Sequence, residues 1–457
     1  MKEKKAKEPK WAELPTINPN AAGLDISVRE IVACVPRDRA EEPIRVFGTY
    51  TPDLQALGDW LKACGVDTVA MEATGVYWIP VYEVLEERGF EVHLVNARHC
   101  KNVPGRKSDV SDSQWIQTLH TYGLLRGSFL PERTWRTLRT YWRQRMTLIE
   151  HRAAHIQHMQ KALQQMNLQL SQVLSDVTGV TGMQIMRAIV AGERDCVKLA
   201  QLRDRRCAHS TDEIAKALSG NYRPEHVFAL KQALALYDFY SAQISECDAE
   251  MERQYASMET PTGPNGGALP PLGSKPKSSS HCKNAPAFDV RKHIYRLTGV
   301  DLVAVTGLEE NSVQTIMAEI GTDMTRWRSV KHFCSWLGLA PHNDTSGGKV
   351  LRSKALKQRN RAGQAFRLAA QSVMRSNCAF GAFFRRLASH IGVEQAIVAT
   401  AHKIARTVYA MLKKQLAFHE MGADEYERRY RERVIARLRK KACSLGFQLI
   451  PQEASPS

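Results

Sequence analysis

The stretch VDTVAMEATGVYWIPVYEVLEERGFEVHLVNA, residues 66–97, decides the fold of the first part of the chain. Residues 67–71 and 90–96 form two short runs with the length and composition of strands. Between them, residues 76–88 favour a helix that Gly89 ends. Strands joined through a helix pair in parallel. The stretch therefore predicts a strand, helix, strand unit.

Working outward, three β-type runs precede this unit at residues 22–28, 31–35 and 44–50. Short turns join them, which favours antiparallel pairing. Thr51-Pro52 opens a helix to about Cys64, and a further helix is predicted from about Asp109 to Tyr122. The order predicts a five-stranded mixed sheet with helices, as in an RNase-H-like α/β domain.

Composition favours a nucleic-acid partner. The chain has 457 residues, with 64 Lys and Arg against 47 Asp and Glu, and a formal net charge of +17. Such an excess favours a polyanion as partner. No apolar stretch approaches the ~20 residues of a membrane span, and the charged start does not resemble a secretory signal. With ten scattered cysteines, which predict reduced thiols, we expect a cytoplasmic protein that binds no membrane.

Four carboxylates are placed where such a fold can bring them together. Asp25 lies inside an apolar run, where a carboxylate is costly to bury without a partner or cation. Glu72 ends a later strand, and Asp109 and Asp112 start the last predicted helix at a spacing that gives them one face. Alone, each is weak evidence, because Glu72 fits a plainer role as a capping acid and Asp109 and Asp112 fit one as first-turn acids. As a set, they predict a site for Mg²⁺ or Mn²⁺.

Residues 131–259 are predicted to be a helical, coiled-coil dimerisation segment. Apolar residues recur every seven positions, which is typical of the seam of a long helix: Trp142, Ile149, Ile156, Leu163 and Leu170. A helix packed within the same chain fits nearly as well, and residues 224–258 are a candidate returning partner. The histidines on one face of this helix are interpreted as surface or interface side chains: His151, His155 and His158.

Three blocks resemble the DEDD, RuvC-like domain of the IS-one-ten family of bacterial insertion-sequence transposases: GLDIS at 23–27, the segment at 71–97 and KSDVSD at 107–112. WLGLAPHNDTSGGKVLRSKALKQRNRAGQAFRLAA, residues 336–370, is similar to the family's second, helical domain. The resemblance spans most of residues 20–420. It departs from the family's usual KTD and DA, since this chain has KSD and Asp112-Ser113.

The resemblance implies specific roles. The four acids Asp25, Glu72, Asp109 and Asp112 would bind Mg²⁺, and Ser346 would be the nucleophile. The family is described as guided by a structured bridge RNA and as working in a dimer or tetramer, in which acids and serine from different subunits meet. From its surroundings alone, Ser346 fits an ordinary polar serine in a flexible Ser-Gly-Gly loop, because a free hydroxyl needs a base or metal for activation.

A basic stretch follows the candidate serine. No Asp or Glu occurs between Asp344 and Glu394, whereas a solvated helix face normally mixes both signs. We therefore predict contacts with the phosphate backbone of nucleic acid from residues in this stretch: Lys349, Arg352, Lys354, Lys357, Arg359, Arg361 and Arg367.

Together these features predict a DNA transposase or site-specific recombinase that cuts and rejoins donor and target DNA through a phosphoserine. The alternatives are a hydrolytic, RuvC-like junction nuclease and a non-catalytic nucleic-acid-binding scaffold. The predicted parts are a basic tail (1–17), the metal-binding domain (18–130), the coiled-coil segment (131–259), a Pro/Gly/Ser-rich linker (260–287), a mostly helical serine domain (288–422) and a basic C-terminal tail (423–457).

Overall fold

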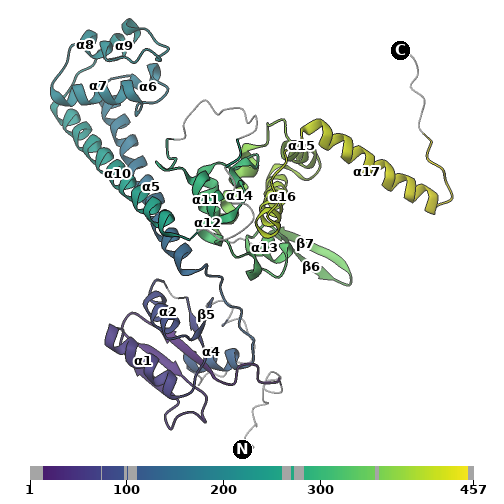
Figure 1. The fold of residues 1–457 in the computed structure, drawn as a ribbon. Helices are drawn as coiled ribbons and strands as arrows, with labels where there is room; N and C mark the ends of the chain where they lie inside the picture. Colours follow the sequence, from purple (N-terminus) through teal and green to yellow (C-terminus); the bar gives the residue numbers. More distant parts are fainter. Residues whose placement is uncertain are drawn as a thin grey trace, which may run out of the picture. The chain divides into compact units, whose positions relative to one another are not determined.

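The computed structural model describes residues 14–73, 75–96, 100, 111–259, 269–271, 283–355 and 360–450, with the backbone alone at 342 and 352–355. The chain divides into two compact units, Met1–Leu130 and Pro131–Ser457, here called the N-terminal and C-terminal units (Figure 1). Each is described by itself below.

The N-terminal unit contains the predicted five-stranded mixed sheet. Its strands are β1 (Ala21–Ile26), β2 (Ile31–Cys34), β3 (Ile44–Phe47), β4 (Thr68–Glu72) and β5 (Glu91–Val95), in the spatial order β3-β2-β1-β4-β5. The pairs β1–β2 and β2–β3 are antiparallel, whereas β1–β4 and β4–β5 are parallel. This confirms the RNase-H-like fold class.

Helices cover both faces of this sheet. The helices α1 (Thr51–Ala63) and α2 (Trp78–Glu87) share one apolar core with alternate residues of the central strands, such as Leu24 and Met71. The helix α4 (Asp112–Thr121) lies on the opposite face, where Ile116 packs with Ala70. The side chains of a strand alternate between faces, so β1 and β4 each present one set of residues to α4.

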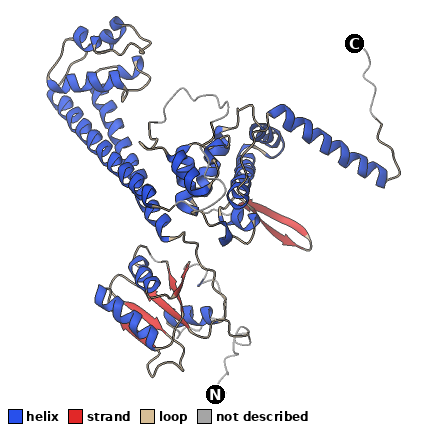
Figure 2. Ribbon diagram, viewed as in Figure 1, coloured by secondary structure: helices blue, strands red, loops and turns tan. Residues whose placement is uncertain are grey.

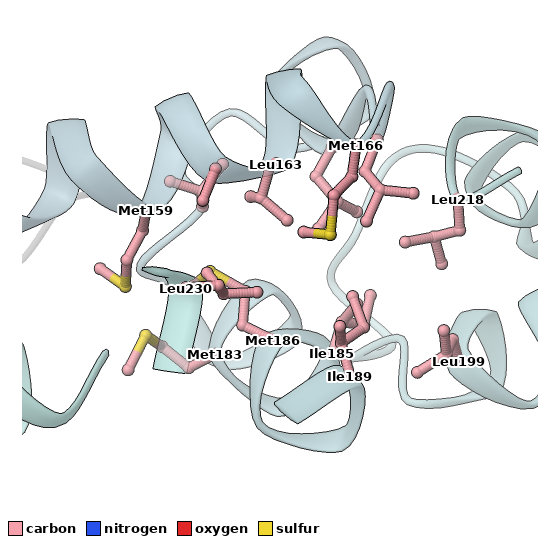
Figure 3. Close-up of a cluster of buried hydrophobic side chains, with 14 of the residues drawn as sticks. Met159, Leu163, Met166, Met183, Ile185, Met186, Ile189, Leu199, Leu218 and Leu230 are labelled. Carbon is pink, nitrogen blue, oxygen red and sulfur yellow. The ribbon is translucent and has the colours of Figure 1, made fainter. Parts of the chain in front are cut away.

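A helical hairpin opens the C-terminal unit. The helices α5 (Arg133–Gln165) and α10 (Pro224–Ser257) pack along each other in antiparallel fashion. Between them lie α6 (Leu170–Val173), α7 (Val180–Ala191), α8 (Cys196–Gln201) and α9 (Thr211–Ala217). The end of α5 and the start of α10 share a methionine-rich core with these short helices, and Figure 3 shows part of it around Met159, Met186 and Leu230.

The seven-residue seam of α5 is therefore covered within the chain. Trp142, Ile149 and Leu163 are buried, and Ile156 packs against the core that contains Leu163. Arg145, three residues after Trp142, is buried and forms two hydrogen bonds with Asp248 of α10, at 2.6 and 3.1 Å. The intrachain partner that was weighed as the alternative, residues 224–258, is the one observed, so these seam positions are not open to a second copy.

The rest of the C-terminal unit is mostly helical, as predicted. Its elements are α11 (Val290–Thr298), η2 (Leu302–Ala304), α12 (Glu310–Ile320), η3 (Met324–Arg326), α13 (Val330–Trp336), β6 (Pro341–Ser346), β7 (Lys349–Ala355), α14 (Arg361–Ser372), α15 (Ala379–Ile391), α16 (Val393–Lys414) and α17 (Ala423–Ser444). Among the helices of the described residues, none combines the length and apolar character needed to cross a bilayer.

Two segments that were predicted to be irregular have described contacts of their own. Ser346 ends the first strand of an antiparallel hairpin, β6–β7, drawn in red in Figure 2, and Gly347-Gly348 form its turn. The predicted linker also has a packed end, because the backbone carbonyls of Asn284 and Ala285 accept hydrogen bonds from Arg145 at 3.0 and 3.1 Å. Most of the remaining linker residues lie outside the described part of the chain.

Candidate active site

Asp25 and Glu72 end neighbouring parallel strands. The paired positions of β1 and β4 run up to Leu24 and Met71, so Asp25 and Glu72 follow one residue later on both strands. Neighbouring strands lie about 4.8 Å apart, and these two residues share the face that carries α4. Both side chains are half-buried. The register thus sets two carboxylates side by side at the carboxyl edge of the sheet.

The start of α4 lies at the same edge because of Gly23. A Cβ at Gly23 would stand 2.3 Å from both the Ser113 carbonyl oxygen and the Gln117 amide nitrogen, so only glycine allows this approach. Gly23 lies two residues before Asp25, on the same face of β1. Asp112, the first residue of α4, is thereby held near the end of the strand that carries Asp25.

The other end of α4 is fixed to the beginnings of the strands. Buried His120 forms a 2.8 Å hydrogen bond with the Thr68 hydroxyl at the start of β4, and its carbonyl accepts one from Asn18 at 2.7 Å. Burial and the neighbouring His93 lower the pKa of His120 to about 4. α4 consequently runs antiparallel to β1 and β4, with its amino end at the acidic edge.

The carboxylates at this edge of the sheet affect the pKa of one buried thiol, that of Cys100. Burial, together with the negative charges of Glu72 and Asp112, raises the pKa of Cys100 to about 11. The carbonyl of Cys100 accepts a 3.0 Å hydrogen bond from the Trp115 indole of α4. Glu72 and Asp112, which belong to different elements, therefore both lie close enough to this thiol for their fields to reach it.

The fourth acid is not part of this geometry. Asp109 lies outside the described residues, and α4 begins at Asp112 with Ser111 as its N-cap, three residues later than predicted. The argument that one helix presents both acids on one face therefore does not apply to α4. Within the described ranges, no group of three or more His, Cys, Asp or Glu side chains is arranged to hold a metal ion.

Ser346 ends the first strand of an exposed hairpin. It is paired with Lys349 across the two-residue turn Gly347-Gly348, whose φ angles are +55° and +77°. Two positive φ values define the tight turn that best matches strand twist, and they favour glycine. Ser346 is exposed, and an added Cβ on either glycine would meet no atom within 4 Å. The hairpin thus presents the serine hydroxyl at its tip.

The predicted phosphate-binding residues fall into three groups. Lys349 and Arg361 are exposed, beside the hairpin turn and at the start of α14. Arg367 is half-buried and donates a 2.7 Å hydrogen bond to the carbonyl of Gly338, which gives it a packing role as well. The side chains of the remaining residues lie outside the described part of the structure: Arg352, Lys354, Lys357 and Arg359.

Fold and site together define a class of protein. A five-stranded mixed sheet of RNase-H-like topology, followed by a mostly helical region, is consistent with the fold of a DEDD transposase. Residues 22–168 match the DEDD transposase model of IS110, and residues 301–385 match the transposase model of the IS116/IS110/IS902 family.

The two matches cover about half of the chain, and the protein belongs to the IS110 (IS-one-ten) family of transposases. It is therefore an enzyme that acts on DNA in transposition. No curated protein matches the chain. The four acids lie within the first matched segment and Ser346 lies within the second.

Sequence reasoning missed two features of the site. Gly23 was not singled out, although a glycine two residues before a strand carboxylate marks a close approach on the face of that carboxylate. The hairpin was also missed, although Gly-Gly between two short runs is a recognised hairpin signal. No comparable sequence signal marks His120, because a single histidine in a helix carries no motif.

Proposed function

We propose that this transposase cuts and rejoins DNA through a covalent bond to Ser346, assisted by a divalent cation at Asp25, Glu72, Asp109 and Asp112. The observation that carries the proposal is the adjacent placement of Asp25 and Glu72 on one face of the sheet, with Asp112 at the same edge. Carboxylate oxygens are the ligands that Mg²⁺ and Mn²⁺ prefer, so the donor set fits. Asp109 is included on the family resemblance.

In the proposed reaction, the Ser346 Oγ bonds to a backbone phosphorus and loses its proton to a base. The bond from that phosphorus to one deoxyribose oxygen breaks, and the freed oxygen takes up a proton. A deoxyribose hydroxyl of another DNA end then displaces Ser346, which restores the enzyme and joins the strands. A bound Mg²⁺ would neutralise negative charge on the phosphate oxygens. Since no bond energy is lost to water, the sequence of steps favours rejoining.

The surroundings of Ser346 support this role in three ways. Its hydroxyl has no hydrogen-bond partner among the described residues, so it is available to a substrate, and activation has to come from elsewhere. The cation of Lys349 stands opposite it in the hairpin register, where it can attract a phosphate. The tight glycine turn leaves the tip open on its outer side.

The covalent step is tested by trapping it. The full chain is incubated with donor and target DNA, Mg²⁺ and the RNA that co-purifies with it, then run on a denaturing gel. We expect a protein–DNA adduct that Ser346→Ala abolishes. Ser335→Ala, which changes an exposed serine of α13, is the control and should keep the adduct. Cleavage without any adduct would favour the hydrolytic alternative, and full activity of Ser346→Ala would refute the role of the serine as nucleophile.

The acids are tested separately. Asp25→Asn and Glu72→Gln keep the shape of each side chain and remove its charge, so we expect strand exchange to fall by at least ~10²-fold, in line with losses of electrostatic stabilisation. Chelation of divalent ions should have the same effect on the wild-type protein. Unchanged strand exchange in both variants would instead support a scaffold without catalysis.

We further propose that a structured guide RNA selects the DNA and that the active form is a homo-oligomer. Base pairing can supply sequence choice that phosphate contacts cannot. Sequencing the RNA bound to the purified protein should return one discrete structured species, and light scattering should give a mass of two or four chains. A random RNA population, or a monomer that remains active, would contradict these two proposals respectively.

A further inference from the structure

The helix α17 follows both segments that match the family, and it combines a fixed root with an exposed far half. Its root is Tyr426, which is buried in a small cluster with Ala382 of α15 and Ala423. The Tyr426 hydroxyl accepts a 2.6 Å hydrogen bond from Arg386, whose guanidinium lies 3.6 Å from the ring centre of Tyr430. These contacts hold the first two turns of α17 on α15.

Beyond the root, the charges of the helix separate along its length. In its first half, Glu425 accepts hydrogen bonds from Arg428 and Arg429, and Glu432 accepts one from Arg428 at 2.7 Å. These acids neutralise the arginines beside them. After Glu432 no acid occurs before Glu453. This acid-free stretch of α17, residues 433–441, is here called the basic arm, and its cations are Arg433, Arg437, Arg439, Lys440 and Lys441.

All five cations of the basic arm are exposed. The contacts of α17 with other elements are chiefly with α15, at its root, and Figure 1 shows the helix leading away from α15. Arg433, Arg437 and Lys441 follow at intervals of four, so they form one stripe along the helix. Their positions are about 6 Å apart along the axis, because an α-helix rises about 1.5 Å per residue.

We infer that the basic arm is a second DNA-binding element, which lies against duplex DNA and contacts its phosphate backbone. Five exposed cations without an acid match a polyanion, whereas a second copy of the same segment would meet it with like charge. An exposed straight helix fits the major groove of B-form DNA, which is about 12 Å wide. The major groove of A-form RNA is too deep and narrow to admit it. This inference does not depend on the proposed chemistry of Ser346.

The test compares two variants of the full chain that lose the same charge from the same helix. R437Q/K441Q removes two cations of the basic arm, and R428Q/R429Q removes two arginines that already pair with Glu425. Binding to a fluorescent 30-base-pair DNA duplex is measured by anisotropy at several salt concentrations. Circular dichroism checks that both variants remain helical, which we expect because all four side chains are exposed.

For R437Q/K441Q, we expect weaker binding and a plot of log affinity against log salt that is shallower by about 1.8, since each lost phosphate contact removes about 0.9. R428Q/R429Q should change the slope by less than half of that. Equal slopes for both variants, or wild-type binding by R437Q/K441Q, would overturn the inference. So would an equal or larger loss on an RNA duplex of the same length, because that would assign the arm to RNA.

Discussion

At the scale of single residues, His120 makes the stability of the N-terminal unit depend on pH. Its folded-state pKa is about 4 and its ordinary value is 6.5, because burial and His93 disfavour the charged ring. Between these pH values the unfolded chain binds a proton that the folded chain does not, so stability falls as pH drops from 6.5 towards 4. Over the whole range, this group changes the free energy of unfolding by about 3 kcal/mol.

We predict that His120→Asn flattens this pH dependence. Asparagine can still donate a hydrogen bond towards Thr68, but it does not titrate. The measurement is urea unfolding of the full chain at pH 7, 6 and 5, followed by far-ultraviolet circular dichroism. The wild-type protein should lose stability across this range, and the variant should lose clearly less. Parallel loss in both proteins would show that other groups dominate.

At the scale of elements, the contact between α4 and β1 depends on Gly23. We predict that Gly23→Ala destabilises the N-terminal unit by about 1–3 kcal/mol, as expected for overpacking. The reason is that a Cβ would stand 2.3 Å from backbone atoms of Ser113 and Gln117, which cannot move without shifting the helix. Because that helix carries Asp112, strand exchange should fall as well.

The matched control for this change is Gly127→Ala. A Cβ at Gly127 would make only an ordinary 3.4 Å contact with the ring of His93, so its effect should be small. Thermal unfolding of the two variants and the wild-type protein gives the comparison. If the Gly23→Ala variant were as stable as the Gly127→Ala variant, α4 would not pack against β1 as described.

A second prediction at this scale concerns the buried pair that joins α5 to α10. Arg145→Met leaves Asp248 buried without its cation, which we expect to cost about 3–5 kcal/mol. The double change R145M/D248L removes both charges, so it should cost less than the single change. Chemical unfolding of both variants measures the difference. A double variant less stable than R145M alone would mean that the apolar pair cannot fill the space.

The elements also show how far sequence reasoning reaches here. The strands and helices of the N-terminal unit were predictable because each is short, bounded by Gly or Pro, and ordered as β-α units dictate. The seam of α5 was equally visible, but a seven-residue repeat does not say which helix covers it. That choice is made by tertiary contacts such as Arg145 with Asp248, which lie 103 residues apart.

The candidate site shows the same limit. Asp25 and Glu72 could be predicted as neighbours because parallel strands end at a common edge. The start of α4 was placed too early, since the N-cap Ser111 and its partner Gln114 were not recognised as a capping box. The acids and Ser346 belong to separate units. A sequence pattern gives no information about the distance between two units, so it does not predict whether these residues meet.

At the scale of the whole molecule, each of the two units has a core of its own. The sheet and its helices enclose one core in the N-terminal unit, and the α5–α10 hairpin encloses another with α6–α9. Units with separate cores commonly unfold as separate cooperative steps. The two stabilising contacts discussed above, at Gly23 and Arg145, belong to different units and so provide a probe for each.

We therefore predict that calorimetry of the full chain shows two unfolding transitions. Each of the two variants should lower the temperature of a different one. Gly23→Ala should lower the temperature of one transition and leave the other in place, because its strain falls on the contact between α4 and the sheet. Arg145→Met should do the reverse, since its unpaired carboxylate lies between α5 and α10. A single transition that both variants lower would mean that the units fold as one body, and the acids and the serine would then belong to a single cooperative structure.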